Sequence, residues 1–154
     1  MNNCVYLYIS LSFKPTFMER RDYILHQIQE MGAFLVRLVT RLRKKNQKPN
    51  EVLTRVSNDL KKELHLDLDE VLFLDDESFI AVLKEKLLST QNFEHFAVFL
   101  EQFGDMALDN ETFLRQQIYY TKALTLLNFM EENSQNYSME RQEKIAQIRL
   151  KLLN

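Results

Sequence analysis

The scarcity of glycine and proline is the feature that most constrains what this chain can fold into. Its 154 residues include only two Gly and two Pro, whereas average usage would give roughly eighteen. Antiparallel sandwiches and barrels need a turn about every 8–12 residues, commonly made by Gly, Pro or Asn. Phosphate-binding loops need closely spaced glycines, but Gly32 and Gly104 lie far apart. The sequence therefore favours helices and excludes glycine-rich nucleotide loops.

The length and composition are those of one globular domain. Apolar residues make up 45% of the chain and charged residues 27%, with a net charge of −2. The single cysteine, Cys4, excludes an intrachain disulfide and a metal site with several cysteine ligands. No apolar run approaches the roughly 20 residues of a membrane span. We expect a cytoplasmic protein without a cofactor.

Residues 1–17 differ from the rest of the chain. Val5, Leu7 and Ile9 alternate with polar or aromatic residues, which is typical of a strand. Two interpretations stay open. The segment is either an upstream extension that precedes a true start at Met18, or an N-terminal arm that packs on the body. In both cases we expect residues 18–154 to form a single helical domain.

The clearest helix follows, from about Glu19 to Lys45. Apolar residues recur at spacings of four and three, as in a heptad seam. They are Ile24, Ile28, Met31, Leu35, Leu38 and Leu42. Flanking apolar residues, including Leu25 and Val36, widen this face beyond what one neighbouring helix needs. The broad face predicts self-association, most simply as a homodimer.

Five further helical segments complete an all-α fold of five or six antiparallel helices. The expected caps are Asn50, Asp76, the pair Asp109-Asn110, and Ser138. We expect a helix to start near Asn92, and residues 66–76 to form a short helix or an extended connector. Phe93, Phe96 and Phe99 cannot all point the same way from one helix, so we expect some of them at an interface.

The C-terminal half resembles a tetratricopeptide repeat over residues 97–130. The residues that carry the resemblance are Leu100, Phe103, Gly104, Ala107, Tyr120 and Ala123. In such a repeat, small residues let two helices approach and aromatic residues fill the gap. Gln116 and Asn128 depart from the pattern. Separately, the segment beginning Arg21-Asp22-Tyr23-Ile24, with the six-helix plan, is similar to bacterial helical proteins of uncharacterised function. These resemblances imply a fold and no activity.

The ionisable clusters do not form a recognisable reaction centre. Six carboxylates lie between Asp67 and Glu77, but Leu72 and Ser78 occupy the positions where a calcium loop needs Gly and Glu. We interpret this stretch as a solvated acidic connector. His26 and Glu30 are four residues apart and could face each other, yet no nucleophile accompanies them. His65 and His95 complete no zinc motif. We therefore expect a protein that is not an enzyme.

The strongest charge run contains six cations and no acid between residues 37 and 48. Arg37, Arg41, Lys44 and Lys48 recur at helical spacing and form what we call the basic stripe, the candidate partner-binding residues. Three interpretations compete: a solubilising helix end, a contact with the acidic connector, and a nucleic-acid footprint. The function we predict is a non-catalytic helical interaction or adaptor module. The alternative is a small nucleic-acid-associated regulator that uses the basic stripe.

Overall fold

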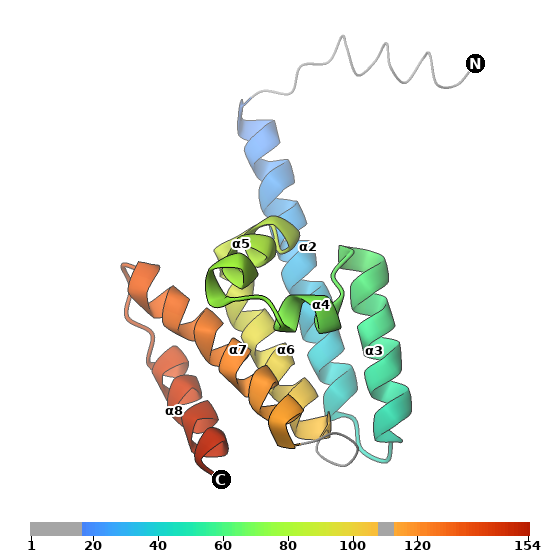
Figure 1. Ribbon diagram of the computed structural model, residues 1–154. Helices are drawn as coiled ribbons and strands as arrows, with labels where there is room; N and C mark the ends of the chain where they lie inside the picture. Colours follow the sequence, from blue (N-terminus) through green and yellow to red (C-terminus); the bar gives the residue numbers. More distant parts are fainter. Residues whose placement is uncertain (1–16, 108–112) are drawn as a thin grey trace, which may run out of the picture.

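The chain folds into a bundle of helices, which confirms the all-α prediction. The computed structural model describes residues 17–107 and 113–154 (Figure 1). Residues 1–16, and with them the predicted strand and Cys4, lie outside the described part. The helices are α2 (Phe17–Arg43), α3 (Pro49–Leu64), α4 (Leu68–Leu72), α5 (Asp76–Lys86), the 3-10 helix η1 (Thr90–Asn92), α6 (Phe93–Met106), α7 (Phe113–Asn133) and α8 (Met139–Leu153).

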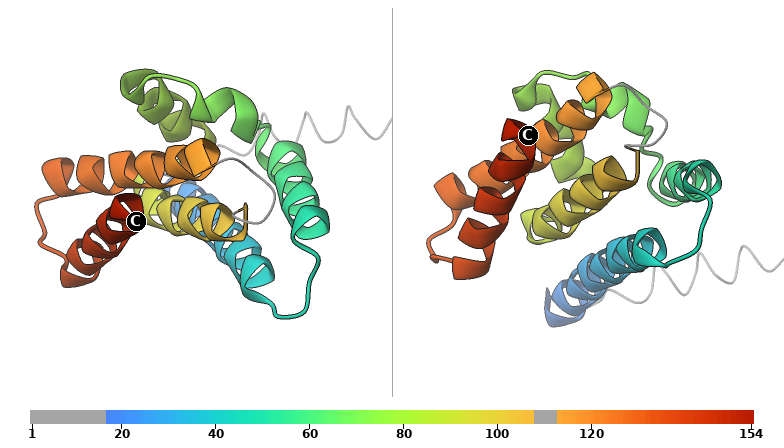
Figure 2. Two further views of the ribbon diagram at one scale, coloured as in Figure 1. Left: turned by 60° about the horizontal axis from the view of Figure 1, so that its bottom comes forward. Right: turned by 90° about the horizontal axis from the view of Figure 1, so that it is seen from below.

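Helix α6 forms the centre of the core. Figure 2 shows it between α2 and α7, the two helices with which it shares most of its contacts. Phe93, Phe96 and Phe99 are all fully buried within this one chain. The expectation that some of them lie at an interface is therefore wrong. A helix covered on two sides can bury aromatic residues that point in different directions.

Small residues set the approach of α6 and α7. A Cβ atom added at Gly104 would lie 3.1 Å from Tyr119 Cβ and 3.1 Å from Tyr120 Cε1. Ala107 and Ala123 are also fully buried. This close contact is what the repeat resemblance implies, but any tightly crossed helix pair needs small residues in the same way. It therefore does not assign the hairpin to the repeat family.

The helix boundaries correct two of the predicted caps. Helix α3 begins with Pro49 after Lys48, so Asn50 lies inside the helix and does not cap it. Helix α5 is capped by Asp75, which accepts from the backbone N–H of Ser78, rather than by Asp76. Ser138 caps α8 as predicted. The acidic connector contains the short helix α4, and Asp109-Asn110 lies outside the described residues.

Helix α2 is buried along only part of its length. Leu35, Leu38 and Leu42 of the predicted apolar seam are buried, whereas Ile28 and Met31 are half-buried and Ile24 is exposed. Figure 1 shows the reason, because the N-terminal half of α2 extends past the rest of the bundle. The apolar seam runs along the whole of α2, but the neighbouring helices cover only its C-terminal part.

Candidate functional site

The N-terminal part of α2 is an exposed amphipathic segment. Every residue from 18 to 27 is exposed, and we call this segment the overhang. Tyr23 is 63% exposed and Ile24 53%, whereas Leu35 on the same helix is completely buried. The overhang spans about 15 Å at the rise of an α-helix.

Within the described ranges, none of the helices has both the length and the hydrophobicity of a membrane span.

Local side-chain contacts support the helical conformation of the overhang. Gln27 Nε2 donates a hydrogen bond to Tyr23 Oη at 3.1 Å. His26 Nε2 lies 3.9 Å from Glu30 Oε1, so the predicted pairing is present, although both side chains are mostly exposed. Such pairs stabilise a helix by only about 0.2–0.5 kcal/mol each. The overhang therefore has modest support of its own and exposes apolar surface that a partner could cover.

A shallow groove continues this apolar surface toward the body of the bundle. It has a volume of about 320 Å³. Met31 and Phe34 of α2, Leu64 of α3 and Leu88 contribute its apolar side chains. Leu88 is 49% exposed. The candidate interaction surface thus runs from the overhang onto the folded core.

The basic stripe does not lie on one helix, because α2 ends at Arg43. Arg37 and Arg41 lie on α2, Lys44 follows its end, and Lys48 precedes α3. The charges of the stripe are partly neutralised. Arg41 forms an ion pair with Asp59 of α3, and Lys48 Nζ lies 3.9 Å from Glu51 Oε1. The guanidinium of Arg37 lies 5.9 Å from the centre of the Phe34 ring. Lys44 is exposed and, with Arg41, lines a cleft of about 350 Å³ beside α3. In the described residues, the partners of the stripe are therefore not in the acidic connector.

The acidic connector pairs with other cations instead. Asp67 accepts from Lys61 Nζ at 3.1 Å, a contact that lowers the pKa of this carboxyl. Asp69 pairs with Arg115, and Asp76 Oδ1 lies 3.0 Å from Lys122 Nζ. The carboxylates thus point to different neighbours. In residues 17–107 and 113–154, no three His, Cys, Asp or Glu side chains are grouped to hold a metal ion.

The remaining histidines have structural positions. His65 ends α3 in a left-handed conformation with φ of 52°. His95 lies on α6 beside Gly32, where an added Cβ would be 3.5 Å from the His95 Cδ2 atom. Its side chain is exposed. Neither residue joins a cluster of catalytic type in the described part of the chain.

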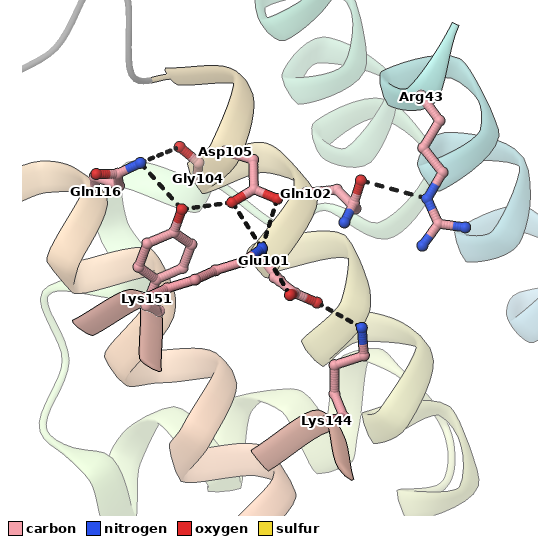
Figure 3. Close-up of polar contacts among 9 residues, drawn as sticks. Arg43, Glu101, Gln102, Gly104, Asp105, Gln116, Lys144 and Lys151 are labelled. Carbon is pink, nitrogen blue, oxygen red and sulfur yellow. Dashed lines mark hydrogen bonds and ion pairs between the residues drawn. The ribbon is translucent and has the colours of Figure 1, made fainter. Parts of the chain in front are cut away.

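A partly buried polar network joins α6, α7 and α8 (Figure 3). Glu101 is only 2% exposed, and its two carboxylate oxygens lie 3.0 Å from Lys144 Nζ and 2.8 Å from Lys151 Nζ. Lys151 Nζ also donates to Asp105 Oδ2 at 2.7 Å. Tyr120 Oη donates to Asp105 Oδ1 at 2.5 Å. These contacts link α8 to α6, the central helix of the bundle.

The electrostatics of this network oppose a change of protonation near neutral pH. Burial, followed by the hydrogen bond to Asp105, raises the pKa of Tyr120. Burial would lower the pKa of Lys151, but its hydrogen bonds to Asp105 and Glu101 outweigh this effect and raise the pKa. The phenol therefore stays neutral and the ammonium stays charged. Both groups are held in contacts with neighbouring side chains.

This network was not predicted from the sequence, although the spacing of its charged residues carried a signal. Glu101 and Asp105 are four residues apart on α6, and Lys144 and Lys151 are seven apart on α8. Each pair shares one face of its helix. An acidic pair on one helix face and a basic pair on another could have indicated that these helices pack together. Gln116, a departure from the repeat pattern, donates to Tyr120 Oη at 3.0 Å and to the carbonyl of Gly104 at 3.2 Å.

No protein-family model matches this chain, and no similar curated protein or solved structure was found.

Proposed function

We propose that this protein is a non-catalytic helical interaction or adaptor module that self-associates through the overhang. The observation that carries the proposal is the continuity of one helix face. That face is buried at Leu35 and Leu38 and remains apolar, but exposed, at Ile24. A soluble helix usually places polar residues where it meets water, so exposed apolar residues in continuation of a core stripe indicate a binding surface.

The energetics favour a reversible dimer. Met18, Tyr23, Ile24 and Leu25 together form the apolar part of the overhang. Burying the exposed part of each side chain would contribute roughly 1 kcal/mol. Two copies double this contribution, and the loss of rigid-body freedom on association offsets part of it. The apolar surface of the overhang therefore favours a reversible homodimer.

Two observations favour protein binding over catalysis and over nucleic-acid binding. The buried Glu101 and the half-buried Asp105 and Lys151 contact one another, which is typical of a structural network. The basic stripe is less suited to nucleic acid than its sequence suggested, because Arg41 and Lys48 already face carboxylates. A protein partner, here a second copy, matches the exposed apolar surface better than a polyanion does.

Analytical ultracentrifugation tests the proposal. At high micromolar concentration, we expect a mass near twice the 18.5 kDa of the chain. The variant Ile24→Glu should shift the equilibrium to monomer, because it places a charge in the proposed interface. Leu150→Glu is the matched control, since Leu150 is 62% exposed on α8 and lies outside the overhang. It should dimerise like the wild type.

A wild-type protein that remains monomeric at this concentration contradicts the self-association. If Ile24→Glu and Leu150→Glu weaken the dimer equally, the overhang is not the dimer interface. Circular dichroism of both variants should show wild-type helicity, because both positions are exposed.

A further inference from the structure

A groove lies between α5 and α7. It has a volume of about 650 Å³. Ile80 and Ala81 of α5 and Phe129 of α7 contribute its apolar surface, while Glu77 and Glu132 contribute carboxylates. We call these five residues and the space between them the docking groove. Its volume lies within the range of about 300–1,000 Å³ that is typical of ligand-binding clefts.

The docking groove carries an excess of negative charge. Asp76, which also lines it, pairs with Lys122. Lys84 also lines the groove, and its Nζ lies 4.9 Å from the centre of the Phe129 ring. Within the described ranges, Glu77 and Glu132 make no ion pair. A partner that brings cations beside apolar side chains would therefore complement the groove.

The overhang has the composition that the groove requires. Arg20 and Arg21 are exposed and form no ion pair with the described residues. Met18, Ile24 and Leu25 lie three or four residues from Arg21, so they share a helix face with it. The overhang thus presents two guanidinium groups next to apolar side chains, opposite in charge to Glu77 and Glu132.

We propose that the overhang of one copy binds in the docking groove of a second copy, and that the second copy returns the same contact. This inference rests on the proposed self-association and names the surface that the overhang contacts. Figure 1 shows the overhang at the same end of the molecule as α5 and the C-terminal end of α7. A two-fold axis near that end brings each overhang to the groove of the partner. The assembly is then closed, and each contact is made twice.

A charge-swap experiment tests the arrangement. The first variant combines Arg20→Glu with Arg21→Glu, and the second combines Glu77→Arg with Glu132→Arg. In a homodimer of either variant, both contacts place like charges together. We expect each variant alone to dimerise about ten-fold more weakly than the wild type at low ionic strength.

An equimolar mixture of the two variants should recover wild-type affinity. In the mixed dimer, the glutamates of one overhang meet the arginines of one groove, and the arginines of the other overhang meet the glutamates of the other groove. Sedimentation equilibrium measures all four dissociation constants. A control variant, Glu85→Arg with Glu140→Arg, makes the same change of charge at exposed positions outside the groove and should dimerise like the wild type.

The outcomes separate this inference from the proposed function. If the wild type dimerises and the groove variant dimerises equally well, the overhang binds elsewhere and only the docking inference fails. A mixture no tighter than the separate variants, or a control as weak as the groove variant, also overturns it. If the wild type is monomeric, the proposed self-association fails as well.

Discussion

Replacement of Gly104 by alanine sets two physical effects of opposite sign against each other. Helix propensity alone predicts that Gly104→Ala in α6 stabilises the protein by roughly 0.5–1 kcal/mol, because glycine loses more backbone entropy on folding. Packing predicts the reverse. The new Cβ would lie 3.1 Å from both Tyr119 Cβ and Tyr120 Cε1, closer than an ordinary carbon contact.

The packing effect should dominate because neither neighbour can move easily. Tyr119 Cβ is bonded to the backbone of α7, and the Tyr120 ring is held by hydrogen bonds to Asp105 and Gln116. Overpacking a close contact costs about 1–3 kcal/mol. After subtraction of the gain in helix propensity, we expect a net destabilisation of about 1 kcal/mol.

Urea unfolding followed by circular dichroism measures the difference. Ala146→Gly is the control, because Ala146 is exposed on α8 and its substitution reports the Gly–Ala propensity difference in this protein. We expect the control to lose about 1 kcal/mol. If Gly104→Ala is instead more stable than the wild type by a similar amount, the crossing of α6 and α7 is looser than the structure indicates, and the reasoning is refuted.

Three further predictions follow from buried contacts and surface charge. Ala123→Arg should lower the urea midpoint severely, because a guanidinium has no room at this fully buried position; an unchanged midpoint contradicts its burial. Stability should fall as the pH rises above about 10, because the raised pKa values of Tyr120 and Lys151 favour their protonated forms in the folded state. Urea midpoints between pH 8 and 11 should fall less steeply for Tyr120→Phe, and an unchanged slope rejects the linkage. In fluorescence anisotropy, the wild type should not bind duplex or single-stranded DNA at physiological salt. Micromolar binding that is lost in the double variant Arg37→Gln/Arg41→Gln, with a salt slope near −0.9 per phosphate contact, would favour the nucleic-acid alternative.

The local features of the fold were accessible from the sequence because they depend on residues close together in the chain. The period of apolar residues predicted the long helices, and Ser138 was a correct cap. The N-cap of α5 was assigned to the wrong residue, because Asp75 and Asp76 are adjacent and either carboxylate could cap the helix. Asp75 caps α5, whereas Asp76 faces Lys122 of α7. That choice depends on a helix more than forty positions away.

The candidate site was only partly predictable. The apolar seam of α2 correctly indicated a helix with more apolar surface than one neighbour needs. The basic stripe was evident as a charge run, but its pairing with Asp59 was not. The network of Glu101, Asp105 and Lys151 was missed, because its members come from helices about forty to fifty positions apart.

The sequence by itself determined that the chain is helical, which residues form the apolar seam of α2, and where α8 begins. Only the tertiary structure decided which part of the seam is covered. Ile24 and Leu38 occupy equivalent positions in the same heptad pattern, yet one is 53% exposed and the other 1%. Periodicity records the direction in which a side chain points. Burial depends on how far the neighbouring helices extend, and α2 is longer than the bundle that packs against it.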